Sequence, residues 1–108
     1  MACYRVELTE RALAHFRGHV DDIVNELRNP DAALRLWDAL GRSIDAPADH
    51  PETAPLCVDR ALRGFGYRKK LIDGTRYLCV CRVEGDVVWI DGIYRELQDY
   101  ENLFATGE

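Results

Sequence analysis

Cations and aromatic rings are concentrated in the second half of the chain, and these residues are the best suited to chemistry. Between residues 60 and 82 a single acid, Asp73, stands among the cations Arg60, Arg63, Arg68, Lys69, Lys70, Arg76 and Arg82. Trp89, Tyr94, Arg95 and Tyr100 follow. Guanidinium and ammonium groups bind phosphates and carboxylates, and aromatic rings stack on bases. The pattern predicts a surface that grips a nucleic-acid backbone or docks an acidic partner peptide.

A structural alternative remains open for the same residues. Charged side chains on an uncovered sheet face keep that face soluble and protect its edges from pairing. The formal net charge of −5, from 14 Lys and Arg against 19 Asp and Glu, argues against a chain that coats nucleic acid non-specifically. Such binding accumulates from many cation–phosphate contacts.

Two other patterns resemble sites without completing one. His15 and His19 are four residues apart, a spacing used by metal ligands, but no further Cys, Asp or His pattern completes a set. Cys79 and Cys81 could join a redox or metal site, yet two cysteines on one side of a strand are more typical of core packing. We expect neither a metal nor a cofactor, and both histidines at the surface beside an apolar helix stripe.

The elements that position these residues follow from hydrophobic periodicity. Residues 3–8 alternate apolar and polar side chains, as in a strand with one buried face. Thr9 offers an N-cap for a helix over residues 10–28, whose apolar residues recur three and four apart. A second helix restarts at Asn29-Pro30. The short connection predicts an antiparallel helical hairpin that packs on a sheet.

Three strand-like runs follow a proline-containing loop, at about residues 62–72, 75–84 and 87–94. Asp73-Gly74 and Glu84-Gly85-Asp86 are hairpin signals, so these runs predict an antiparallel meander. The expected fold class is α+β in the order β-α-α-β-β-β. It has a helical hairpin on one face of a mainly antiparallel sheet, and a short C-terminal tail.

Alternation along the strands assigns side chains to the two faces of this sheet. Cys79 and Cys81 should lie beneath the helices, and Trp89, Ile93 and Arg95 should share one face of the last strand. If the helices cover one face only, the other face gathers five cations: Arg68, Lys70, Arg76, Arg82 and Arg95.

Size and composition indicate a single domain over residues 1–108. The chain is 47% apolar and 31% charged, and its apolar runs are too short to cross a bilayer. Four cysteines without a visible signal peptide favour a reducing cytoplasm. We therefore expect a cytoplasmic protein without a membrane partner.

The order of these features resembles the RelE/ParE toxin superfamily of bacterial type II toxin–antitoxin systems. The likeness covers nearly the whole chain. It rests on the basic strand, the strand-turn-strand and the closing Gln-Asp-Tyr within "ALRGFGYRKKLIDGTRYLCVCRVEGDVVWIDGIYRELQDYENL", and on "RNPDAALRLWDAL", which looks like the second helix of ParE-type members. It implies a growth inhibitor that a small antitoxin neutralises. RelE-type members are ribosome-dependent mRNA endonucleases, and ParE-type members act on DNA gyrase.

The resemblance also implies roles for particular residues. Arg68 and Lys70 match catalytic cations that stabilise charge on the transferring phosphate, and Arg95 and Tyr100 match a phosphate-stabilising Arg and a catalytic Tyr of some RelE-type members. Leu78 stands where RelE-type members have an Arg. Many relatives also carry His-Gly-Arg where this chain has Arg95-Glu96-Leu97. Nucleic-acid or partner binding is then expected at Arg63, Arg76, Arg82, Trp89 and Tyr94.

These departures favour a ParE-like inhibitor, with gyrase as its expected target, over an enzyme. Two alternatives stay open: a RelE-type endoribonuclease, and a degenerate homologue that only binds an antitoxin. The expected partners are a cognate antitoxin and either gyrase or the ribosome with its mRNA. The chain could act in plasmid stabilisation, and it could form a homodimer or a toxin–antitoxin heterotetramer.

Overall fold

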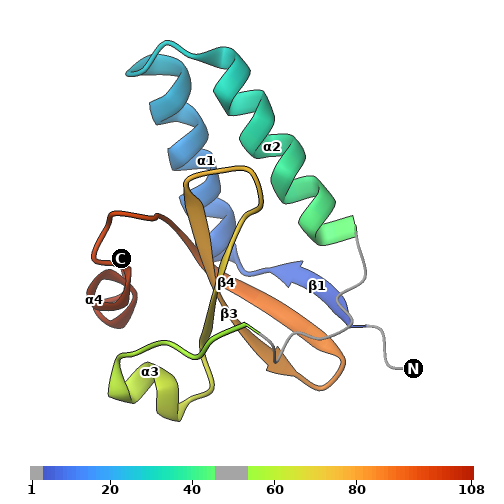
Figure 1. Cartoon of the computed structure of the whole chain (residues 1–108), viewed down its shortest axis with the longest axis vertical. Helices are drawn as coiled ribbons and strands as arrows, with labels where there is room; N and C mark the ends of the chain where they lie inside the picture. Colours follow the sequence, from blue (N-terminus) through green and yellow to red (C-terminus); the bar gives the residue numbers. More distant parts are fainter. Residues whose placement is uncertain (1–3, 46–53) are drawn as a thin grey trace.

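The computed structural model describes residues 4–45 and 54–108. Figure 1 shows a helical hairpin on one side of a sheet and two short helices toward the other side. The elements in chain order are β1 (Arg5–Leu8), α1 (Glu10–Asn25), α2 (Pro30–Asp45), α3 (Arg60–Gly64), β2 (Arg68–Leu71), β3 (Tyr77–Glu84), β4 (Val87–Arg95) and α4 (Tyr100–Ala105). None of the helices within the described ranges is long and apolar enough to cross a membrane.

Caps fix the beginnings of both hairpin helices where the sequence predicts them. The backbone N–H of Ala12 donates to the Thr9 hydroxyl (3.2 Å), and the N–H of Ala32 donates to Oδ1 of Asn29 (3.1 Å). Each cap satisfies an N–H group that lacks an intrahelical acceptor. The predicted hairpin is confirmed.

The sheet has four strands in the order β1-β4-β3-β2. β1 pairs parallel with β4, whereas β2–β3 and β3–β4 are antiparallel. Gly74 (φ 77°) and Gly85 (φ 63°) supply the left-handed residues of the two turns. The α+β class and the antiparallel meander are confirmed.

Two segments differ from the prediction. The strand expected from residue 62 begins only at Arg68, because Asp59 caps the short helix α3: its Oδ1 accepts from the N–H groups of Ala61 (3.0 Å) and Leu62 (3.1 Å). The expected tail contains α4. Both short helices bury apolar side chains against the sheet, through Leu62 in α3 and Phe104 in α4.

The two short helices create a second hydrophobic core on the sheet face that the sequence left uncovered. The hairpin core contains Phe16, Leu36, Cys79, Cys81 and Ile93 among its buried residues. The second core joins Cys57, Leu62, Leu78, Val80, Tyr94 and Phe104. Cys79 and Cys81 therefore lie beneath the hairpin as predicted. The expectation of one open basic face is wrong, because α3 and α4 cover that face.

A β-bulge in β4 changes the alternation of its side chains. Val80 pairs with Gly92 but Cys81 pairs with Ile90, so Asp91 is an extra residue on β4. Ile90 and Ile93 consequently both belong to the hairpin core. Trp89 lies opposite Arg82 on the other face, so the prediction that Trp89 and Ile93 share one face is wrong for this reason.

Candidate partner-binding site

The structure separates the residues expected to catalyse RNA cleavage. Arg68 and Lys70 lie opposite Cys81 and Cys79 across the β2–β3 ladder, and directly opposed residues share a face. Those cysteines belong to the hairpin core, so both cations lie on the hairpin side. Tyr100 instead packs against the second core. The sheet therefore stands between this tyrosine and the two cations.

A cation that was not among the expected catalytic residues lies near the Tyr100 ring. The Lys69 ammonium lies 6.0 Å from the ring centroid, because Lys69 alternates to the face opposite Arg68 and Lys70. Burial raises the pKa of Tyr100 to about 12, with the neighbouring Glu101 and Cys57 adding to the shift. A phenol with this pKa is a poor proton acceptor at neutral pH.

Arg95 lies far from Arg68 along the sheet. It pairs with Tyr77 at the beginning of β3, whereas Arg68 pairs with Cys81 further along the same strand. Arg95 is instead held beside Arg76, because the N–H of Glu96 donates to the Arg76 carbonyl (2.9 Å). The structure thus brings together two of the predicted cations.

The residues expected to bind partners are dispersed. Arg63 is exposed on α3, and Trp89 is half-buried opposite Arg82 on the face of the second core. Arg82 forms an ion pair with Glu84. Tyr94 is only 3% exposed, and its hydroxyl donates to the Glu108 carbonyl (2.7 Å). Tyr94, expected at a partner-binding surface, is thus enclosed in the second core, because the bulge at Asp91 turns its ring toward α4.

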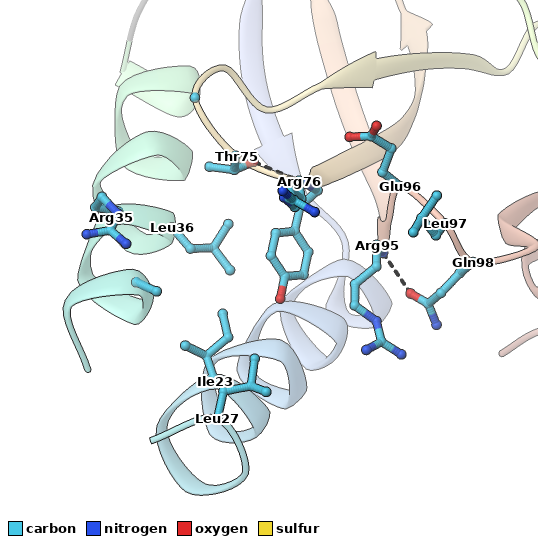
Figure 2. Close-up of a pocket in the computed structure, with 13 residues that line it drawn as sticks. Ile23, Leu27, Arg35, Leu36, Thr75, Arg76, Arg95, Glu96, Leu97 and Gln98 are labelled. Atoms are coloured by element: carbon cyan, nitrogen blue, oxygen red, sulfur yellow. Dashed lines mark hydrogen bonds between the residues drawn. The ribbon is translucent and has the colours of Figure 1, made fainter. Parts of the chain in front are cut away.

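An open pocket of about 950 Å³ lies between the hairpin and the end of β4. Arg76 and Arg95 line it from the sheet side, and Figure 2 shows them together with Ile23 and Leu36 from the helices. A third arginine, Arg35 on α2, also lines it. Sequence reasoning missed Arg35, because helical periodicity marks it only as an exposed residue beside the buried Leu36.

The segment that closes one side of the pocket is held by local hydrogen bonds. The N–H of Arg95 donates to Oε1 of Gln98 (2.7 Å), and the N–H of Gln98 donates back to the Arg95 carbonyl (3.0 Å). Leu97 is left 93% exposed at the tip of this turn. The C-terminal segment therefore presents a cation and an apolar side chain at the same opening.

His15 and His19 have a structural role, because both bind the backbone of Ile93 in β4. The N–H of Ile93 donates to Nδ1 of His15 (3.2 Å), and Nε2 of His19 donates to the Ile93 carbonyl (2.7 Å). Burial lowers the pKa of both histidines, with Arg11 adding to the shift of His15 and Arg95 to that of His19. Within residues 4–45 and 54–108, no three His, Cys, Asp or Glu side chains are grouped to hold a metal.

Comparisons with known proteins agree with this architecture. Residues 6–100 match the family model described as "ParE toxin of type II toxin-antitoxin system, parDE". A solved chain of the chromosomal ParDE toxin–antitoxin system from P. aeruginosa is similar in fold, with a TM-score of 0.67 at 20% identity over 88% of this chain and 98% of that one. A search among curated proteins found no match. With the family match running from β1 to the start of α4, the chain belongs to the ParE toxin family of type II toxin–antitoxin systems.

Proposed function

We propose that this chain inhibits growth by acting on DNA gyrase and that a cognate antitoxin neutralises it. Family membership supports a toxin. The observation that carries the choice of mechanism is the position of Tyr100, which packs on the second core while Arg68 and Lys70 lie on the hairpin side. Phosphodiester cleavage needs its proton-transfer and charge-stabilising groups within contact distance of one phosphate. The proposal implies action in the cytoplasm, where gyrase works.

Tyr100→Phe separates this function from RNA cleavage. No hydrogen bond of the Tyr100 hydroxyl is present among the described residues, so the variant should keep its ring packing and its stability. We expect inducible expression of the wild type to stop bacterial growth, and Tyr100→Phe to stop it equally. Mapping of mRNA ends should show no new cleavage at ribosomal codons.

Two results would count against the proposal. No growth inhibition by the wild type, with soluble protein present, would indicate a homologue that retains only antitoxin binding. Cleavage of mRNA on ribosomes that disappears in both Tyr100→Phe and Arg95→Ala would favour the endoribonuclease.

The stoichiometry of the complex is a separate question. Light scattering of the co-expressed toxin and antitoxin would distinguish a simple pair from a heterotetramer.

A further inference from the structure

A row of apolar residues is exposed along α2. Leu34 is 62% exposed and Trp37 is 60% exposed, and the half-buried Gly41 follows one turn later. Residues three and four apart lie above one another on a helix, so these three residues form one row, called the apolar row below. Figure 1 shows α2 at the upper right edge of the molecule, alongside α1. Leu34 and Trp37 are not among the buried residues of the hairpin core.

The Trp37 ring is held in position although most of it faces solvent. It contacts the ring of the buried Phe16 of α1, with 5.5 Å between the ring centroids and 51° between the ring planes. An aromatic side chain that is already positioned loses less conformational freedom when a partner covers it. Tryptophan is also enriched among the residues that contribute most to protein interfaces. Trp37 is therefore suited to the centre of a contact.

Four alternating charges run beside the apolar row. Asp31, Arg35, Asp38 and Arg42 are all exposed, and their spacing of four, three and four residues places them on one side of the helix. The ion pairs present in the described parts of the chain involve none of them. Their signs alternate from negative to positive along the chain. The same series read backwards therefore has the opposite sign at every position.

We propose that two copies of this chain associate through α2, packed antiparallel about a two-fold axis at Trp37. Residues equally far from Trp37 in the sequence then lie opposite each other. The two Trp37 rings meet at the axis, and Leu34 of each copy lies within one residue of Gly41 of the other. A Cβ added at Gly41 meets nothing within 4 Å, so the space above this residue is open to the leucine.

The charges select a second copy in this orientation. The same axis brings Asp31 of one copy opposite Arg42 of the other, and Arg35 opposite Asp38, each to within one residue. Every pair occurs twice because the two-fold contact is isologous. A parallel pair of helices in register would instead place like charges together, which opposes association. The inference does not rest on the proposed action on gyrase.

Sedimentation equilibrium of the chain without any partner tests the proposal. We expect a reversible monomer–dimer equilibrium with a Kd of about 10–100 µM, because a contact between two four-turn helices is small. Arg35→Asp places an acid opposite Asp38 at both ends of the axis and should weaken the dimer about tenfold. The charge exchange Arg35→Asp, Asp38→Arg restores opposite signs and should return the Kd to the wild-type value.

Two further variants separate this contact from general effects. Arg60→Asp makes the same charge change at an exposed position of α3 and should leave the Kd unchanged. Leu34→Gln should weaken the dimer, whereas Leu97→Gln, at a residue that is 93% exposed after β4, should not. Thermal unfolding of each variant verifies that it is folded.

Four outcomes would overturn the inference. The first is a wild-type chain that stays monomeric well above about 100 µM. The second is a charge exchange that dimerises no better than Arg35→Asp, and the third is equal weakening by Arg60→Asp and Arg35→Asp. The fourth is a monomeric chain whose binding to co-expressed antitoxin is lost in Leu34→Gln, because the apolar row would then belong to that partner.

Discussion

At the scale of single residues, Asp91 and Gly92 shape the centre of the sheet. The Asp91 carboxylate accepts from the hydroxyls of Thr9 (3.1 Å) and Tyr67 (3.2 Å) and pairs with Arg11 (3.4 Å). Asp91 is half-buried, and several partners compensate the partial loss of water around its carboxylate. The side chain of the bulged residue Asp91 thus links the start of α1 to the segment before β2. The alternating pattern of this strand in the sequence gives no signal for the bulge.

Gly92→Ala tests how closely the sheet and Tyr94 are packed. A Cβ at residue 92 meets Cε2 of the Tyr94 ring at 2.7 Å, so the buried ring must shift. We expect the free energy of unfolding to fall by about 1–3 kcal/mol, the usual cost of overpacking a core. Urea unfolding measures this loss.

Gly18→Ala is the control for that substitution. Its Cβ meets nothing within 4 Å on the exposed side of α1, so alanine should stabilise the helix slightly, by up to about 1 kcal/mol. Equal effects of the two substitutions would contradict the packing described for Tyr94.

At the scale of elements, α1 takes the place of a strand along part of β4. β1 pairs with β4 only as far as Ile90. Beyond that point Nε of Arg11 donates to the Asp91 carbonyl (3.0 Å), and His15 and His19 bond the backbone of Ile93. One side of the helix therefore satisfies backbone groups that would otherwise be exposed at a sheet edge.

The two histidines make stability depend on pH. Both have a pKa lowered from 6.5 in the folded protein, so below about pH 6.5 the unfolded chain binds more protons than the folded one. Stability is therefore full above this pH and is lost as the pH falls through the lowered values. His15 must remain unprotonated at Nδ1 to accept from Ile93.

The double variant His15→Gln, His19→Gln should remove part of this dependence. An amide can still accept from the Ile93 N–H or donate to its carbonyl, but it does not titrate. Urea unfolding at pH 7.5 and pH 5.5 should show a smaller acid-induced loss in the variant than in the wild type. An equal loss in both would show that the two histidines do not cause the acid sensitivity.

Element prediction succeeded where the signal is local and failed where it depends on tertiary packing. Thr9 and Asn29 predict where the hairpin helices begin, and the turns at Gly74 and Gly85 predict the antiparallel meander. The five residues of α3 and the six of α4 are too few for helical periodicity to appear. They are stabilised by burial of Leu62 and Phe104, which no local pattern reveals.

At the scale of the whole molecule, helices cover both faces of the sheet and divide the cations. Arg68 and Lys70 lie on the hairpin side, Lys69 and Arg82 on the other, and Arg95 at the pocket. Strand alternation could predict that the Lys69 side chain lies on the opposite face of the sheet from Arg68 and Lys70. It could not predict the covered second face, and so it grouped cations that the sheet separates.

The division of cations supports the proposal that this chain acts by binding a target, since Arg68 and Lys70 lie across the sheet from Tyr100. The same architecture leaves an open surface at the end of β4, where cationic and apolar side chains lie together. A protein that acts by holding its target requires such a surface.

The most direct test of this account is a supercoiling assay with purified DNA gyrase, relaxed plasmid and ATP. We expect the purified chain to inhibit supercoiling, and the Tyr100→Phe variant to inhibit it equally. Full supercoiling at a large excess of folded chain, together with cleavage of mRNA on purified ribosomes by the same preparation, would contradict it.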